Sequence, residues 1–153
     1  MNQHNKCHIF IDLPIHKTEH PNNKYSIEDL IPILQSYSNV KYLAISNVES
    51  AKDLEKYLES FSSFLTLIPK IESPTCVNNI EEITNGLTSK QKIIILDHDD
   101  LCSSMLKKGE PITNFVEYIN KLTDYCTKNH IIFLRTIGVI FSDDKKRVTA
   151  YIK

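Results

Sequence analysis

The sequence lacks a long apolar run, an excess of charge of one sign and closely paired cysteines. No stretch approaches the roughly 20 apolar residues of a membrane-spanning helix, and the first segment, "MNQHNKCHIF", lacks the apolar centre of a signal peptide. The 18 basic and 19 acidic residues give a net charge of −1 and are mixed along the chain, so no field draws it to nucleic acid or to a membrane. We therefore expect a cytoplasmic protein that binds neither, whereas a small anionic substrate is compatible with this charge.

Cysteine spacing excludes two further classes of protein. Zinc sites usually contain cysteines at CxxC spacing, and disulfide frameworks are typical of small, cysteine-dense chains. The four cysteines of this chain lie far apart and form no CxxC pair, so we expect reduced thiols. They are Cys7, Cys76, Cys102 and Cys126.

The size and composition of the chain predict one folded domain. It has 153 residues, of which 41% are hydrophobic and 24% charged. A chain of this length forms one hydrophobic core, and a disordered chain would be poorer in Ile, Leu, Phe and Tyr. We place the domain over residues 1–153.

Short β-rich runs alternate with amphipathic stretches along the chain. The runs are apolar throughout, as parallel strands covered on both faces are. Their alternation with helix-like stretches predicts an α/β fold with right-handed crossovers. The runs are "HIFI" (8–11), "KYLAI" (41–45), "FLTLI" (64–68), "KIIIL" (92–96) and "HIIFL" (130–134).

Three serines mark helix starts in the stretches between the runs. Ser26 and Ser50 are each followed three residues later by an aspartate, which suits a capping box. Ser73 precedes Pro74 and the segment "CVNNIEEI", which suits a cap followed by proline at the first helical position. The segment "ITNFVEYINKLTDYC" predicts a longer helix with one apolar stripe. This stripe comprises Ile112, Phe115, Val116, Ile119, Leu122 and Cys126.

Every predicted strand is followed by polar residues. The carboxyl ends of parallel strands share one rim, where α/β proteins bind their ligands. Polar residues also mark ordinary strand ends, but the combination of acids, a lysine, an arginine and hydroxyls at five neighbouring ends favours a site. These residues are Asp12, Ser46, Lys70, Glu72, Asp97, Asp99, Asp100, Arg135 and Thr136.

The charged residues of this rim suit a divalent cation. Glu72 together with one acid of "LDHDDL" offers the carboxylates that Mg²⁺ prefers. Lys70 leaves an extended strand on the same side as Glu72 and would neutralise an oxygen that becomes negative, such as an enolate or a phosphoryl oxygen. The alternative is an ion pair of Lys70 with Glu72 or Asp100 that fixes the strand ends.

Four segments give the chain a resemblance to a known family. They are "IFIDLPIHK", "LAISNVESAKDL", "IPKIESPTCVNNIEEI" and "ILDHDDL", and the resemblance as a whole runs over about residues 8–142. In order and spacing they resemble segments of the pyruvate kinase barrel domain. The chain also resembles a related superfamily, that of citrate lyase β-subunits and metal-dependent hydroxy-oxo-acid aldolases. Its members likewise carry an Ile-Glu segment followed by an Asp-Leu segment. Both belong to the phosphoenolpyruvate/pyruvate type of barrel.

The resemblance implies roles for particular residues. It implies that Lys70 is the catalytic lysine, that Glu72 and Asp100 hold Mg²⁺ or Mn²⁺, and that Thr136 lies near the substrate methylene. Asp12 would lie near a monovalent cation such as K⁺. In the family reaction, metal and lysine stabilise pyruvate enolate while phosphate passes to ADP.

Two further residues complete the expected site. The resemblance implies that a substrate phosphate or carboxylate lies against backbone amides beside Asp99. Ser46, which follows its strand directly, is expected to take part in ligand binding from the same rim.

The chain is shorter than the barrel that it resembles. A complete (β/α)₈ barrel needs about 250 residues, and the strands expected before "HIFI" are missing, so we predict a partial barrel of five or six strands. Open sheet edges require covering or pairing. We therefore expect a homo-oligomer, a partner subunit that supplies the missing strands, or packing by residues 139–153, which suit a hairpin around "SDDKK".

Three functions are compatible with the sequence. The first is a pyruvate kinase-like, Mg²⁺-dependent enzyme that handles phosphoenolpyruvate or pyruvate through an enolate. The second is a related citrate lyase-like or aldolase-like enzyme that uses the same metal without ADP. The third is a non-catalytic partial barrel that acts in binding or assembly.

Overall fold

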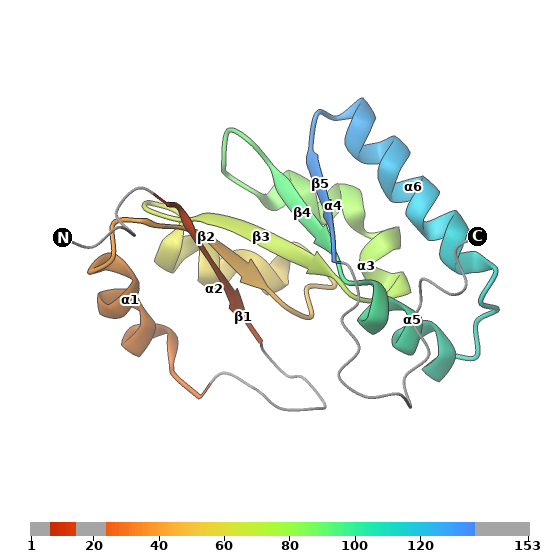
Figure 1. Ribbon diagram of the computed structural model, residues 1–153, viewed down its shortest axis with the longest axis horizontal. Coiled ribbons are helices and arrows are strands. Elements are labelled where there is room, and N and C mark those ends of the chain that lie inside the picture. Colours follow the sequence, from red (N-terminus) through yellow and green to blue (C-terminus); the bar gives the residue numbers. More distant parts are fainter. Residues whose placement is uncertain (1–6, 15–23, 137–153) are drawn as a thin grey trace.

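A computed structural model of the protein describes residues 7–14 and 24–136. Strands and helices alternate along this part of the chain (Figure 1), which confirms the predicted α/β fold. The predicted hairpin at 139–153 lies outside the described residues. The elements are β1 (Ile9–Leu13), α1 (Ile27–Gln35), β2 (Val40–Ile45), α2 (Lys52–Phe61), β3 (Thr66–Ile71), α3 (Pro74–Asn78), α4 (Ile80–Gly86), β4 (Ile93–Leu96), α5 (His98–Lys107), α6 (Asn114–Lys128) and β5 (Ile132–Arg135).

The strands form one parallel sheet in the order β1-β2-β3-β4-β5. Each strand therefore pairs with the next one along the chain, without the reversal of order that marks a doubly wound sheet. All six described helices contribute buried residues to a single core cluster, so they cover the same face of the sheet. Consecutive parallel strands with their helices on one side are also the repeating unit of a β/α barrel, and the described residues provide five such strands.

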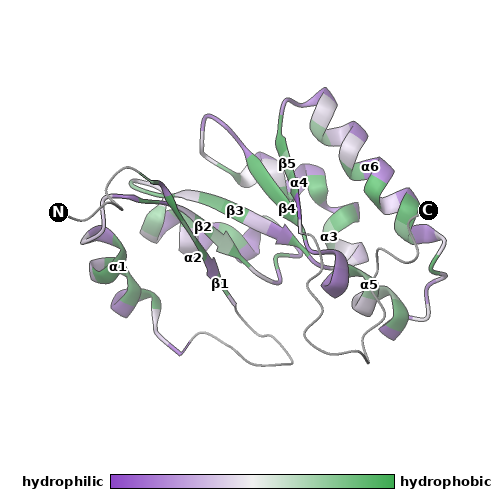
Figure 2. Cartoon of the chain, in the orientation of Figure 1, coloured by the Kyte–Doolittle hydropathy of each residue, from purple (hydrophilic) through white to green (hydrophobic). Residues whose placement is uncertain are grey.

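The two faces of the sheet have different partners. Alternate strand residues, such as Leu43 and Ile94, join the core beneath the helices. The opposite side, which we call the second face, carries a separate buried cluster of Ala44, Ile68, Ile93 and Ile95, all of them strand residues. Figure 2 shows the apolar colour running along β4 and β5, whereas α6 carries polar and apolar residues on different sides. The strand residues are thus apolar on both faces, as the uninterrupted apolar runs predict.

Two of the three predicted helix starts are confirmed. The Ser26 hydroxyl accepts a hydrogen bond from the Asp29 backbone N–H, and Asp29 reaches back to the Ser26 N–H in a capping box. Ser73 caps α3 with Pro74 in its first turn. The third start was wrong by one residue, because α2 begins after Ala51.

At the start of α2 the capping hydrogen bonds are formed by the side chain of Asp53 and not by that of the predicted cap residue, Ser50. The Asp53 carboxylate accepts hydrogen bonds from the backbone N–H groups of Glu49 and Ser50 at 2.9 and 2.8 Å and from the Ser50 hydroxyl. These bonds outweigh the cost of burial and lower the Asp53 pKa. The carboxylate satisfies two backbone donors that the serine hydroxyl alone would leave without partners.

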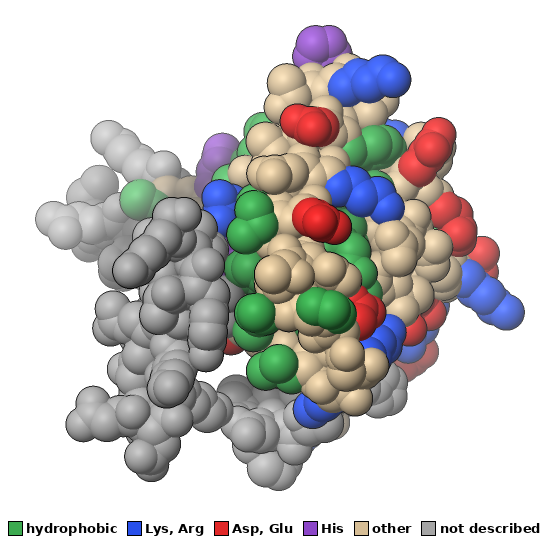
Figure 3. Space-filling model, turned by 90° about the vertical axis from the view of Figure 1, so that its right-hand side faces the viewer, with side chains coloured by type: hydrophobic (Ala, Val, Ile, Leu, Met, Phe, Trp, Pro, Cys, Tyr) green, Lys and Arg blue, Asp and Glu red, His purple; other side chains and the backbone are tan. Residues whose placement is uncertain are grey.

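The helix predicted over "ITNFVEYINKLTDYC" is α6, which begins at Asn114, so the predicted stripe residue Ile112 lies outside the helix. Phe115, Ile119, Leu122 and Cys126 are buried, as predicted, but Val116 is 44% exposed. At about 100° per residue, Val116 lies at the margin of a stripe centred on Phe115 and Ile119, beyond the reach of the sheet. Figure 3, which views this side of the molecule, shows acidic and basic side chains interspersed with apolar ones.

Two strand ends and one helix also differ from the sequence prediction. β3 extends to Ile71 rather than ending at residue 68, because Lys70 and Ile71 pair with Ile95 and Leu96. β1 likewise includes Asp12. The segment "CVNNIEEI" is divided between α3 and α4 at Asn79, whose side chain donates a hydrogen bond to the Glu49 carbonyl at 2.8 Å. No helix among the described residues is both long and apolar enough to span a membrane.

Candidate metal and substrate site

The polar residues at the carboxyl ends of three central strands lie beside one another. Ile71 pairs with Leu96, and Leu96 pairs with Arg135. The next residue in each strand, respectively Glu72, Asp97 and Thr136, is therefore at the same level of the rim. Side chains alternate between the two faces of a strand, so these residues share the second face with Lys70.

Lys70 is a buried cation among carboxylates. It is only 5% exposed, and its Nζ lies 3.2 Å from Asp12 Oδ2, 3.1 Å from Glu72 Oε1 and 3.2 Å from Asp97 Oδ2. Burial by itself would lower the Lys70 pKa, but the negative charges of Glu72, Asp12 and Asp97 outweigh it and raise that pKa above its ordinary value. Lys70 is therefore a permanently protonated group at neutral pH.

Glu72 is held from both sides. Its Oε1 faces the Lys70 ammonium, and its Oε2 accepts a hydrogen bond from the Asn47 backbone N–H at 2.7 Å. Asn47 has φ of 55°, a left-handed conformation that asparagine tolerates better than most residues. The turn after β2 thereby directs a backbone amide at the Glu72 carboxylate. Glu72 as a whole residue is only 4% exposed.

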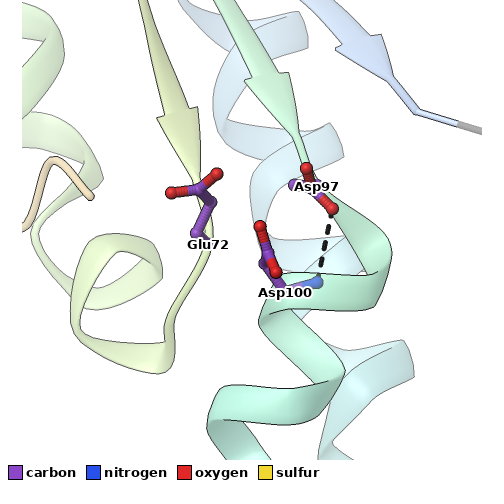
Figure 4. Close-up of side chains that lie close together, drawn as sticks. All are labelled: Glu72, Asp97 and Asp100. Carbon is purple, nitrogen blue, oxygen red and sulfur yellow. Dashed lines mark hydrogen bonds between the residues drawn. The ribbon is translucent and has the colours of Figure 1, made fainter. Parts of the chain in front are cut away.

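Three carboxylates meet beside Lys70. One oxygen each from Glu72, Asp97 and Asp100 lies within 4.8 Å of the others (Figure 4). Asp97 caps α5, and its Oδ1 accepts a hydrogen bond from the Asp100 backbone N–H at 3.3 Å. This first turn of α5 brings the Asp100 carboxylate towards the end of β3.

The donor set of this acidic cluster fits a hard divalent cation. Mg²⁺ binds oxygen ligands at about 2.1 Å and so joins ligands up to about 4.2 Å apart. The present separations of up to 4.8 Å come within that reach by a small rotation of the carboxylates. Glu72, Asp97 and Asp100 are therefore the residues that would hold Mg²⁺ or Mn²⁺.

Two of the other expected site residues lie on the same side of the sheet as Lys70. The Asp12 carboxylate, 47% exposed, forms an ion pair with Lys70. Ser46 follows Ile45, which pairs with Pro69, so Ser46 lies beside Lys70. Its residue is 3% exposed, and its hydroxyl has no hydrogen-bond partner among the described residues.

The last two expected site residues are Thr136, whose hydroxyl forms hydrogen bonds with the backbone, and Asp99, which is exposed. The Thr136 hydroxyl donates to the Leu96 carbonyl at 3.2 Å and accepts from the His98 N–H at 3.3 Å, so it ties the end of β5 to the start of α5. Asp99 is exposed and lies outside the acidic cluster of the described residues. Its backbone belongs to the first turn of α5.

Sequence reasoning did not single out two residues of this region, Asp97 and Asn47. Asp97 was one of several acids, and its position directly after an apolar run was the signal that could have identified it. Asn47 acts through its backbone, for which its side chain gave no signal. His98, 5% exposed, accepts a hydrogen bond at Nε2 from Arg135 Nε at 3.0 Å. Burial and the Arg135 charge lower the His98 pKa.

Comparison with known proteins gives a fold relationship. No protein-family model and no curated protein matches the chain. The crystal structure of RipC from Yersinia pestis is similar, with a TM-score of 0.57 and 25% sequence identity over 79% of this chain and 56% of the RipC chain. The present chain therefore corresponds to little more than half of RipC.

Proposed function

We propose that this protein is a Mg²⁺-dependent enzyme that acts on phosphoenolpyruvate or pyruvate through an enolate, as a pyruvate kinase-like barrel would. The observation that carries the proposal is the convergence of the Glu72, Asp97 and Asp100 carboxylates beside the buried Lys70 ammonium. A divalent cation and a fixed positive charge side by side suit a reaction in which a substrate oxygen becomes negative.

Each residue has a distinct part in this proposal. Glu72, Asp97 and Asp100 hold the cation, which supplies Lewis-acid polarisation of a carbonyl oxygen when bound. Lys70, protonated because of its carboxylate neighbours, offers positive charge to the developing oxyanion and is unsuited to act as a base. Ser46 offers a hydroxyl donor beside Lys70, and its lack of a partner among the described residues leaves the hydroxyl available to a bound substrate.

The charge of the site favours a second candidate within the same chemistry. The site brings together one ammonium and four carboxylates: Asp12, Glu72 and Asp97 pair with Lys70, and Asp100 lies beside Glu72 and Asp97. One divalent cation leaves the group negative overall, so a phosphorylated substrate and ADP meet more repulsion than a monocarboxylate does. A citrate lyase-like or aldolase-like reaction on a 2-oxo acid, which needs no ADP, is therefore the alternative.

Metal binding is the first test. Mn²⁺, followed by the loss of its free-ion electron paramagnetic resonance signal, should bind to the unaltered protein and be displaced by Mg²⁺. Glu72→Gln should weaken binding at least about tenfold, equivalent to about 1.4 kcal/mol. Glu81→Gln, which removes an exposed carboxylate in the first turn of α4, is the matched control and should bind normally.

Enolate formation is the second test. The unaltered protein with Mg²⁺ should exchange the methyl protons of pyruvate for deuterium, as measured by proton NMR in D₂O, and Glu72→Gln should not. Phosphoryl transfer from phosphoenolpyruvate to ADP separates the kinase-like reaction from the lyase-like one. Metal binding without exchange or transfer would leave a non-catalytic metal-binding barrel, and the absence of metal binding would refute the proposed function.

A further inference from the structure

Two cavities open at the amino ends of the strands, opposite to the rim that carries the acidic cluster. The larger, of about 400 Å³, is lined from the starts of β2 and β3, the end of α2 and the segment 87–90. The smaller, of about 290 Å³, is lined from the segment before β4 and the end of α6. Both are lined in part by Lys90. Since β2 and β3 have six residues each, about 20 Å of strand separates these cavities from the rim.

The two ends of the sheet differ in charge. None of the described residues that line either cavity is an aspartate or a glutamate, whereas His8, Lys41 and Lys90 line the larger one and Lys92 and His130 the smaller. No ion pair of Lys41 or Lys90 occurs among the described residues. Acidic side chains thus meet at the rim, whereas the described residues that line the cavities at the amino ends include basic side chains and no acidic ones.

The positive charge of Lys41 and Lys90 exceeds the partial negative charge of the two helix ends that lie beside the larger cavity. α2 and α4 end beside the larger cavity, at Phe61 and Gly86, and each helix end contributes about half a negative charge. The two full charges of Lys41 and Lys90 outweigh these partial charges. The charged side chains among the described residues that line the larger cavity are basic only.

Hydroxyl groups add hydrogen-bond donors to this charge. Ser62, Ser63, Thr66, Thr88 and Ser89 line the larger cavity. The Ser89 hydroxyl is shielded from solvent and has no hydrogen-bond partner among the described residues. A polar atom in this state is usually satisfied by an ordered water or an ion, and a ligand oxygen can take the same place. Ammonium and hydroxyl donors without competing carboxylates are the groups that bind phosphate oxygens.

We propose that the larger cavity binds a small phosphate-bearing molecule, with Lys41 and Lys90 supplying the positive charge and the Ser89 hydroxyl a hydrogen bond. The volume of about 400 Å³ lies in the lower part of the range of about 300 to 1,000 Å³ for small-molecule sites, which suits a sugar phosphate or a mononucleotide. This site goes beyond the proposed function. The larger cavity would bind anions, which the carboxylates of the rim repel.

Backbone NMR with inorganic phosphate and pyrophosphate as probes tests the site. Saturable shifts are expected at residues 62–66 and 87–90, with residues 70–73 and 97–100 unchanged. Shifts at the latter residues, or none that saturate below about 10 mM, a Kd corresponding to roughly −2.7 kcal/mol, would overturn the proposal. Because this measurement needs no variant, it does not depend on the tolerance of the fold to substitution or on the outcome of the metal test.

Charge-matched variants then test the assignment. Lys41→Gln combined with Lys90→Gln should weaken pyrophosphate binding at least about tenfold, and Ser89→Ala should weaken it severalfold. Lys52→Gln combined with Lys107→Gln removes two exposed charges, at the start of α2 and the end of α5, that do not line the cavity, and should leave binding unchanged. Equal weakening by the two double variants would show a general charge effect and refute the site.

Discussion

The Nζ atom of Lys70 lies 3.1 Å from Oε1 of Glu72, with one residue between them in the sequence. Because successive side chains of β3 point to opposite faces of the sheet, both side chains lie on the second face. The carboxylates of Asp12, Asp97 and Asp100 lie beside them. Glu72 belongs both to this ion pair and to the acidic cluster. Lys70 and a cation bound by the cluster therefore act on the same carboxylate, so metal binding and stability should be linked through Lys70.

Lys70→Gln should lower the free energy of unfolding by about 2 to 3 kcal/mol, less than for a fully buried pair because Asp12 is partly exposed. The substitution leaves Asp12, Glu72 and Asp97 without their counter-charge. Mn²⁺ should therefore stabilise the variant more than the unaltered protein in urea unfolding. Lys107→Gln, an exposed control, should change stability by less than about 0.5 kcal/mol. A Lys70→Gln protein of unchanged stability would contradict the linkage.

The capping box of α1 makes a separable contribution to stability. Ser26→Ala removes the hydroxyl that accepts the Asp29 N–H and should lower the free energy of unfolding by about 1 kcal/mol. Ser60→Ala is the matched control, because the Ser60 hydroxyl only bonds the Lys56 carbonyl within α2, where alanine is the better helix former. Equal effects of the two substitutions in urea unfolding would contradict a capping role for Ser26.

Tyr118 should be a late-titrating tyrosine. Its hydroxyl donates to Glu110 at 2.7 Å, and this bond, with burial and the Glu110 charge, raises the pKa of Tyr118 from 10.0 to about 12. The unfolded chain loses this proton near pH 10 and the folded chain near pH 12. The contribution to stability is thus complete below pH 10 and is lost between about pH 10 and 12.

Ultraviolet titration of tyrosinate measures this shift. Tyr118→Phe should remove absorbance change from the late part of the titration, near pH 12, if the protein remains folded there by far-ultraviolet circular dichroism. Tyr37→Phe, at a position that is 59% exposed, should leave the late part unchanged. Loss of amplitude near pH 10 in Tyr118→Phe would show that the Glu110 bond does not form.

The thiols should divide into one reactive group and three protected ones. Cys7 is exposed, whereas Cys76, Cys102 and Cys126 are buried. Burial raises the pKa of all three buried thiols, that of Cys126 to about 11, so they form little thiolate at pH 8. Ellman's reagent should label one thiol rapidly in the native protein and four in urea.

Serine substitutions assign the rapid thiol. Cys7→Ser should abolish rapid labelling, and Cys102→Ser should leave it intact. Rapid labelling of more than one thiol in the native protein would mean that the helices containing the buried cysteines open readily or pack differently.

The sequence by itself determined the elements and their class. Uninterrupted apolar runs predict strands buried on both faces, and Ser26 and Ser73 mark two helix starts because capping depends on a few adjacent residues. The placement of Lys70 and Glu72 on one side of a strand follows from the same local rule. How β3 ends could not be predicted in this way, because Lys70 and Ile71 become strand through pairing with β4.

Only the tertiary structure decided which groups meet. Asp97 joins Glu72 through the register of β3 against β4, and the Asn47 amide reaches Glu72 across 25 positions of sequence. Val116 is exposed because only part of the apolar stripe of α6 packs against the core. These outcomes depend on distances between segments far apart in the chain, whereas residue patterns report the local geometry of one segment at a time.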